Sequence, residues 1–381
     1  MPLVGIWLLI VVALRANDLP RGHVVDPVVA AGNAKQSYAL YIPASHTPGR
    51  TWPIVYCLDP GGRGHVPVEL FSAAAEKAGF IVAGSNNSRN GPFEKQREAI
   101  EWLLRDTHAR LPIDDSRVYV AGMSGGARLA LAWAQNGAIA GVVACAAGFG
   151  NQPPDKVPFH LFLAAGVDDF NYDEIFENSL ELARRGIAHR WTEFDGGHDW
   201  PPSSVGDQAF DYFLGNTPSR PAEPAKRQRK VAAEFNNMMH QVELATHDEK
   251  RVLFHALEKT AAKPVDSDDR RVARRVVMGA FVGYWEQGND ELAEKKYDLA
   301  TRYLEAALIA RPDDPRALYS LALVKAASGN TKSALDALEK AVAHGFRDSV
   351  RLEEEPLLNA LRDEPRYQAI IEKLQAGKSG S

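Results

Sequence analysis

The feature that most constrains the fold of this chain is a joint between two kinds of segment at residues 118–131. A run of β-branched and aromatic residues ends at Gly122, and a run of small, helix-forming residues begins after Ser124. The glycines of this Gly-x-Ser-x-Gly joint, Gly122 and Gly126, leave room for a turn so sharp that larger side chains would collide. The pattern predicts a strand, an exposed serine and a helix whose first N–H group, that of Gly125, faces outward. Ser124 is therefore a candidate nucleophile, and the alternative is a glycine-rich turn that binds an anion.

Strand-like and helix-like segments alternate before and after this joint, from His23 to Leu214. Strands are expected at 22–30, 37–42, 53–58, 80–84, 117–122, 138–145, 160–165 and 189–194. Helices are expected at 66–78, 93–110, 127–136, 172–185 and 205–214. The later strands are short, continuous apolar runs, as in parallel strands that are covered on both faces. The order predicts an α/β domain with a doubly wound, mostly parallel sheet and antiparallel strands at its start.

A serine nucleophile needs a base and an acid, and both follow in the expected chain order. The seventh expected strand ends in Gly-x-x-Asp, which presents Asp169, and the eighth is followed by a Gly-Gly turn and His198. His198 would take the proton of Ser124 and return it to the leaving group, while Asp169 would orient the imidazole and stabilise its cation. The adjacent Asp168 is the alternative acid. Taken alone, His198 would be a surface loop histidine.

The second donor to an oxyanion is expected in the loop after the third strand, which reads Asp-Pro-Gly-Gly. Pro60 has no N–H, so Gly61 is the first candidate and Gly62 the next, each paired with Gly125. The alternative is that these glycines only make a tight turn. The residues expected to line the substrate site are Gly62, Met123 and Trp200.

Three stretches together resemble a known family. DSRVYVAGMSGGA, GVDD and GGHDWPP are similar to α/β-hydrolases of the esterase group related to polyhydroxybutyrate depolymerases, feruloyl esterases and dienelactone hydrolases. The resemblance covers roughly residues 35–215 and implies a carboxylic-ester hydrolase with a Ser124–Asp169–His198 triad and neither metal nor cofactor. Many relatives have His-Gly where this chain has Asp-Pro after the third strand. The substrate, a small-molecule or polymer-linked ester, does not transfer with the resemblance.

Two other functions compete with an esterase. One is a peptidase or acyltransferase on the same fold. The other is a catalytically inactive hydrolase domain that serves as a protein-binding module through the helical part of the chain described next.

The chain turns helical after a proline-rich linker at 216–230, whose basic end is expected to start a solvated helix. Helices are expected over 231–258 and 270–286, and Pro-broken helices over 348–374 would cap the array. Residues 315–346 resemble a tetratricopeptide repeat, and a weaker copy extends the repeats to about 281–346. Small residues recur at the same spacing in the two copies, at Ala300, Ala307, Ala334 and Ala341. The repeats indicate either a surface for a protein partner or a buttress for the hydrolase.

Composition excludes several other classes of protein. The 381 residues suffice for two domains, expected at 22–215 and 231–381, and a net charge of −5 gives no reason to expect nucleic acid. The two cysteines, Cys57 and Cys145, lie in apolar runs and indicate neither a disulfide framework nor a metal site.

Two segments bear on location and access. Residues 1–17 hold an apolar run too short to span a bilayer, which predicts a signal peptide and export to the periplasm or outside of a bacterium. An uncleaved N-terminal anchor and a cytoplasmic protein are the alternatives. The connection at 146–159 is short and rich in proline, so no helical lid and an open site are expected.

Overall fold

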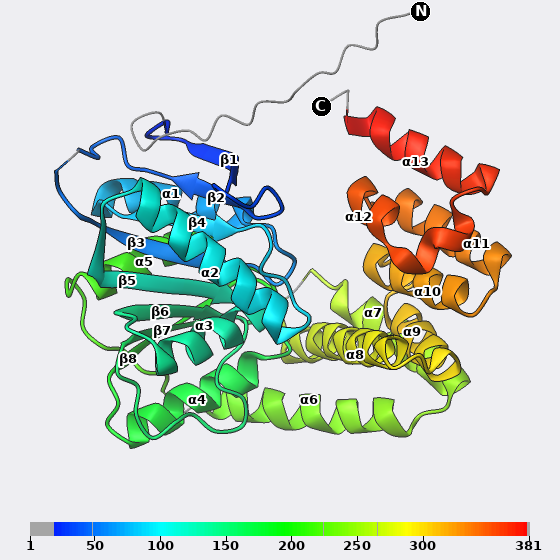
Figure 1. The fold of residues 1–381 in the computed structure, drawn as a ribbon. Coiled ribbons are helices and arrows are strands. Elements are labelled where there is room, and N and C mark those ends of the chain that lie inside the picture. The colour runs from blue at the N-terminus through cyan, green and yellow to red at the C-terminus, as the bar shows by residue number, and fades with distance from the viewer. Residues whose placement is uncertain (1–18, 48, 224, 265, 379–381) are drawn as a thin grey trace, which may run out of the picture. The chain divides into compact units, whose positions relative to one another are not determined.

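The computed structural model describes residues 19–47, 49–223, 225–264 and 266–378 (Figure 1). The chain divides into two compact units, Met1–Ala225 and Lys226–Ser381. The signal or anchor segment expected at 1–17 lies outside the described residues. Within the described ranges, no helix is both long and apolar enough to cross a membrane.

The first unit is built on an eight-stranded sheet with the order β1-β2-β4-β3-β5-β6-β7-β8. Its strands are β1 Val24–Val29, β2 Ser37–Tyr41, β3 Trp52–Leu58, β4 Ile81–Ser85, β5 Ile113–Met123, β6 Gly141–Cys145, β7 His160–Gly166 and β8 His189–Phe194. β2 pairs antiparallel with β1 and β4, and all later pairs are parallel. The predicted fold class, a mostly parallel sheet with antiparallel strands at its start, is confirmed.

Helices cover both faces of this sheet (Figure 1). They are α1 His65–Ala78, α2 Phe93–Arg110, α3 Gly125–Asn136, α4 Tyr172–Arg184 and α5 Ser203–Phe213. Alternate residues of β3 enter the two cores, with Ile54 and Tyr56 on the side of α2, α3 and α4, and Val55 and Cys57 on the side of α1 and α5. Burial on both faces explains why the central strands are continuous apolar runs.

The topology brings the candidate residues to one edge of the sheet. Ser124 follows β5, Asp169 comes three residues after β7, and His198 comes four residues after β8. Because these strands are parallel, their carboxyl ends meet at the same edge, where ligands of such sheets bind.

The two cysteines lie on strands that do not touch. β5 lies between β3, which carries Cys57, and β6, which ends with Cys145. Two strand spacings, about 9–10 Å, exceed the Cα separation of about 7 Å that a disulfide tolerates. Burial raises the pKa of both thiols. We therefore expect two free thiols, measured by mass spectrometry after alkylation in denaturant without reductant. An intramolecular disulfide would contradict the sheet order.

The second unit is helical. Its elements are α6 Lys226–Leu244, α7 His247–Ala261, α8 Asp268–Ala293, α9 Tyr297–Ala310, α10 Pro315–Ala327, α11 Thr331–Ala343, α12 Ser349–Glu354, η2 Pro356–Leu361 and α13 Pro365–Lys378. The small residues of the predicted repeats, Ala300, Ala307, Ala334 and Ala341, are fully buried between helices.

The segment expected to be helical over 231–258 is divided between two helices, α6 and α7. Thr246 caps α7: its hydroxyl accepts from the Glu249 N–H, and the Glu249 carboxylate accepts from the Thr246 N–H. This capping box satisfies backbone donors at a new helix start. The Thr-x-x-Glu pattern at 246–249 indicates a new helix start, which the apolar spacing alone does not reveal.

The basic end of the segment expected as a linker, 226–230, starts α6 at Lys226, as predicted. The part of the linker before it is corrected. Arg220 exchanges two backbone hydrogen bonds with the edge strand β8, of 2.7 and 3.0 Å. The buried Ala222 donates its N–H to the Ser179 hydroxyl at 2.9 Å. The segment up to Ala222 therefore belongs to the first unit. It covers the edge of β8, which would otherwise be exposed.

Candidate active site

Ser124 occupies a backbone conformation that few residues other than glycine adopt, with φ 54° and ψ −122°. Such a conformation costs on the order of 1–3 kcal/mol and persists only where its surroundings impose it. A Cβ on Gly122 would lie 2.2 Å from the Gly126 carbonyl oxygen, and one on Gly126 would lie 2.0 Å from the Leu58 oxygen. Both glycines are thus required by close backbone contacts at the turn between β5 and α3.

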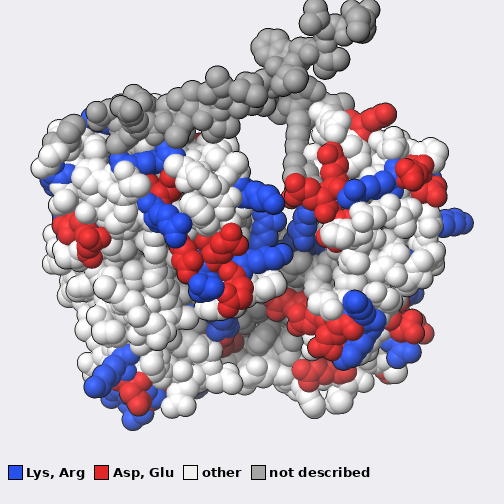
Figure 2. Space-filling model, viewed as in Figure 1, with Lys and Arg blue, Asp and Glu red and all other residues white. Residues whose placement is uncertain are grey.

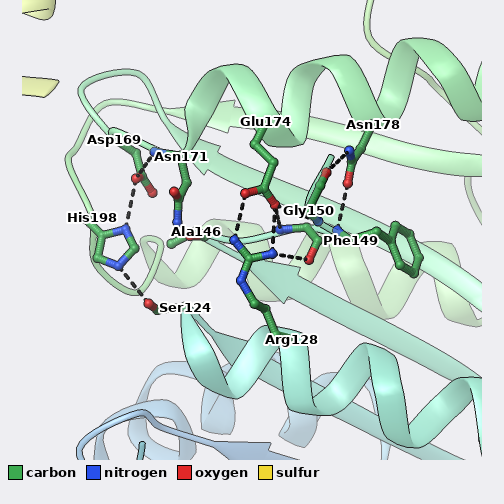
Figure 3. A network of polar contacts seen from close by, with 11 residues as sticks. Ser124, Arg128, Ala146, Phe149, Gly150, Asp169, Asn171, Glu174, Asn178 and His198 are labelled. Atoms are coloured by element: carbon green, nitrogen blue, oxygen red, sulfur yellow. Dashed lines mark hydrogen bonds and ion pairs between the residues drawn. The ribbon is translucent and has the colours of Figure 1, made fainter. Parts of the chain in front are cut away.

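Three side chains form a continuous chain of hydrogen bonds (Figure 3). The Ser124 hydroxyl oxygen lies 2.8 Å from His198 Nε2, and His198 Nδ1 lies 2.9 Å from Asp169 Oδ1. An ionised carboxylate only accepts hydrogen bonds, so Nδ1 carries the proton and Nε2 of the neutral imidazole accepts from Ser124. The His198 side chain is 10% exposed and the Asp169 side chain is fully buried. The arrangement can accept the serine proton and stabilise the resulting imidazolium.

The structure places Asp169, and not Asp168, beside the histidine. The Asp169 N–H donates to the Gly166 oxygen at 3.0 Å, whereas the Asp168 N–H donates to the Gly196 oxygen at 2.9 Å. Asp169 Oδ1 also accepts from the Asn171 N–H at 2.8 Å. The carboxylate is therefore oriented by its own turn as well as by the histidine.

Sequence reasoning missed two residues of this turn, Phe170 and Asn171. The half-buried Phe170 ring lies 4.3 Å, centroid to centroid, from the His198 ring. The Asn171 side chain donates to the Ala146 oxygen at 2.9 Å, which ties the acid turn to the end of β6. An aromatic and an amide residue directly after a candidate acid were the signal available in the sequence.

The connection after β6 is bound to the helices beside it (Figure 3). The Glu174 carboxylate accepts from Arg128 at 2.7 and 3.0 Å and from the N–H groups of Gly148 and Gly150 at 3.0 and 3.1 Å. Burial would raise the pKa of Glu174, but the Arg128 guanidinium outweighs it and the pKa lies below its usual range. Residues 146–159 contain no helix, as the lidless interpretation predicts.

The N–H groups predicted to bind an oxyanion are not all available. No acceptor within the described part of the chain is bonded to the Gly125 N–H, at the start of α3. In contrast, the Gly61 N–H donates to Asp59 Oδ1 at 2.8 Å, and the Gly62 N–H donates to the Asp59 carbonyl at 3.0 Å. The expectation for Gly61 and Gly62 is corrected because both N–H groups donate to Asp59, that of Gly61 to its carboxylate and that of Gly62 to its backbone carbonyl.

Asp59 is fully buried, and its carboxylate accepts hydrogen bonds from several donors. Arg63 Nε and Nη2 donate to its two oxygens, each at 3.0 Å, and Trp200 Nε1 donates to Oδ2 at 2.8 Å. Burial would raise the pKa of the Asp59 carboxyl, but the hydrogen bonds from Arg63 and Trp200 outweigh it and lower the pKa. The carboxylate is thus a fixed charge that connects the loop after β3 with the loop that carries His198.

Two residues expected to line the substrate site belong to the core instead. Trp200 is buried, with its N–H on Asp59 and its ring edge-on to Phe71. Met123 is buried because it is the last residue of β5 and enters the core on the side of α1 and α5. Gly62 is half-buried in the loop after β3. Among the described residues, no group of three or more His, Cys, Asp or Glu side chains is placed to hold a metal ion.

Comparison with known proteins adds a family to part of the second unit. Residues 291–351 match the model of the tetratricopeptide repeat family, which confirms the predicted resemblance with slightly shifted limits. No curated protein matches the sequence.

Several solved structures are similar to about half of the chain. One is the S-formylglutathione hydrolase of Staphylococcus aureus, 16% identical over 52% of this chain and 98% of that chain, with a TM-score of 0.41. Another is a ferulic acid esterase, 18% identical over 51% and 98%, with a TM-score of 0.41. A third is an esterase of Pyrobaculum calidifontis, 15% identical over 53% and 88%, with a TM-score of 0.39. At these identities the likeness does not reach beyond the fold.

Proposed function

We propose that this chain is a serine hydrolase that cleaves carboxylic esters through an acyl-Ser124 intermediate. The observation that carries the proposal is the hydrogen-bonded chain from Ser124 through His198 to the buried Asp169, with distances of 2.8 and 2.9 Å. It stands on a sharp turn at the carboxyl edge of a parallel sheet, where a substrate can approach the serine.

The proposed reaction has two steps. In the first, His198 Nε2 takes the Ser124 proton while the serine oxygen attacks the ester carbonyl carbon, and the Gly125 N–H faces the developing oxyanion. When the tetrahedral intermediate collapses, the bond to the alcohol breaks and His198 gives its proton to the departing alcohol. In the second, water loses a proton to His198 and attacks the acyl carbon. When this intermediate collapses, the bond to Ser124 breaks, His198 returns the proton to the serine oxygen, and the acid departs. Asp169 stabilises the imidazolium in both steps.

A fluorophosphonate probe separates this proposal from an inactive binding module, because only an activated serine reacts with it. We expect one labelled site, mapped to the peptide that carries Ser124, and hydrolysis of p-nitrophenyl esters. Matched amide substrates test the peptidase alternative. A folded protein that neither reacts with the probe nor cleaves any ester would contradict the proposal.

The lack of a helix in the connection at 146–159 predicts a preference for short acyl or bulky aromatic esters. Enclosure provides most of the binding of apolar ligands, and the helix-free connection at 146–159 cannot enclose a long acyl chain. We expect acetyl, butyryl and feruloyl esters to be cleaved faster than palmitoyl esters, without activation at a lipid–water interface.

The same assay on a shortened protein tests whether the helical repeats take part. Because residues up to Ala222 are bound to β8 and Ser179, the shortened protein must retain them and end at Ala225. A palmitoyl preference in that protein would refute the lidless interpretation. A palmitoyl preference seen only at full length would assign the helical unit to the substrate site.

A further inference from the structure

We propose that the side chain of Asn90 supplies the second hydrogen bond to the oxyanion, paired with the Gly125 N–H. The inference rests on the proposed ester hydrolysis and names a catalytic residue of that same site. Asn90 lies in the segment between β4 and α2, far in sequence from Ser124, and none of the motifs points to it.

The first argument is the absence of a free backbone donor in the loop after β3. The Gly61 N–H is directed to the Asp59 carboxylate, and the Gly62 N–H to the Asp59 carbonyl. Asp59 is itself fixed by Arg63 and Trp200, so the arrangement does not depend on one weak contact. A tetrahedral oxyanion stabilised by Gly125 alone would lack the second donor that acyl-transfer sites provide.

The second argument is the position of the Asn90 amide against Gly125. A Cβ added to Gly125 would lie 2.0 Å from Asn90 Oδ1 and 2.9 Å from Nδ2, so the amide fills the space that a side chain would take. The Gly125 nitrogen, which carries the first donor, is bonded to the Cα from which this Cβ would extend. The Asn90 amide thus lies beside the first donor, where we infer that it can reach the same substrate oxygen. Rotation of the amide about its last bond exchanges the nitrogen and the oxygen without moving the chain.

The third argument is that the backbone of Asn90 is fixed while its amide is available. The Asn90 N–H donates to the Pro60 oxygen at 2.8 Å, and Arg89 forms a β-bridge with Gly61. The segment is thus bound to the very loop that lacks a free donor. The side chain is exposed, and its amide forms no hydrogen bond with any residue that the structure describes.

Together these contacts define the proposed step. As the Ser124 oxygen bonds to the carbonyl carbon, the carbonyl oxygen gains negative charge and accepts from the Gly125 N–H and from Asn90 Nδ2. Neither donor loses its proton. When the intermediate collapses, the electron pair on this oxygen re-forms the C=O bond, and the alcohol leaves with the proton of His198. Because the bond forms only with the charged oxygen, its loss lowers kcat and leaves KM nearly unchanged.

The test compares Asn90→Ala and Asn90→Asp with the wild-type full-length protein on a p-nitrophenyl ester. The aspartate keeps the shape of the side chain but offers an ionised acceptor in place of the donor. Loss of one oxyanion donor costs about 10²–10³-fold in kcat, and we expect that loss in both variants with KM within about threefold. Asn136→Ala, at the exposed end of α3, is the matched control and should keep wild-type kcat.

The possible results separate this inference from the proposed function. Thermal melting by circular dichroism shows that the variants are folded. A wild-type protein that is active while both folded Asn90 variants keep kcat within fivefold would overturn the role of Asn90 alone. A wild-type protein that neither hydrolyses esters nor reacts with the fluorophosphonate would overturn both proposals. A selective loss of kcat in the two Asn90 variants supports the inference.

Discussion

Replacing Ser124 with alanine is expected to lower ester turnover about 10⁶-fold, the size of loss that follows removal of such a nucleophile. The hydroxyl is the group that attacks the ester, and the strained turn on which it stands, with φ 54°, places it beside His198. The measurement is the initial rate of p-nitrophenyl butyrate hydrolysis, together with loss of fluorophosphonate labelling. Turnover above about one hundredth of the wild-type rate would refute the mechanism, because binding without the nucleophile leaves only a small residual rate.

The chain contains a matched control for this variant. The Ser179 hydroxyl lies 2.6 Å from His189 Nε2, a second serine–histidine pair with the same kind of contact. Both residues are buried and the other histidine nitrogen bonds to the Ile187 carbonyl, not to a carboxylate. Ser179→Ala should therefore leave kcat unchanged and lower thermal stability, since the Ala222 N–H loses its acceptor.

Local pattern was enough to predict the elements that carry the chemistry. The apolar runs predict β5, β6 and β7 because central parallel strands are buried on both faces, which leaves little freedom in composition. The Gly-x-Ser-x-Gly joint predicts the turn at Ser124 because close backbone contacts exclude larger residues there. The chain order of acid and histidine then follows from the topology of the sheet.

The features that sequence missed depend on contacts between distant segments. Whether the Gly61 N–H is free depends on Asp59, whose orientation is set by Arg63 and by Trp200 from a loop 141 residues further along the chain. Because of the same contact, Trp200 lies in the core, although it was expected to line the substrate site. Asn90 likewise reaches Gly125 only because its segment pairs with Gly61. No periodicity or spacing encodes such partners, because each is decided by the packing of two loops on one sheet edge.

The effect of the acid is the second large prediction. Asp169→Asn is expected to lower kcat about 10⁴-fold, and Asp168→Asn far less. The neighbouring carboxyls differ in their surroundings, since Asp169 Oδ1 accepts from both His198 Nδ1 and the Asn171 N–H, at 2.9 and 2.8 Å. An asparagine keeps the size of the side chain but removes the charge that stabilises the imidazolium. It also no longer holds the proton of the neutral imidazole on His198 Nδ1.

The measurement that decides between the two acids is kcat for both variants, at a temperature where circular dichroism shows each to be folded, since both side chains are buried. Fluorophosphonate labelling adds a second readout. In Asp169→Asn the probe should still reach Ser124, because the nucleophile remains, but react much more slowly than with the wild-type protein. A larger loss in Asp168→Asn would transfer the role of the acid to that residue. Equal and small losses would mean that His198 functions without a carboxylate, which its fully buried partner at 2.9 Å argues against.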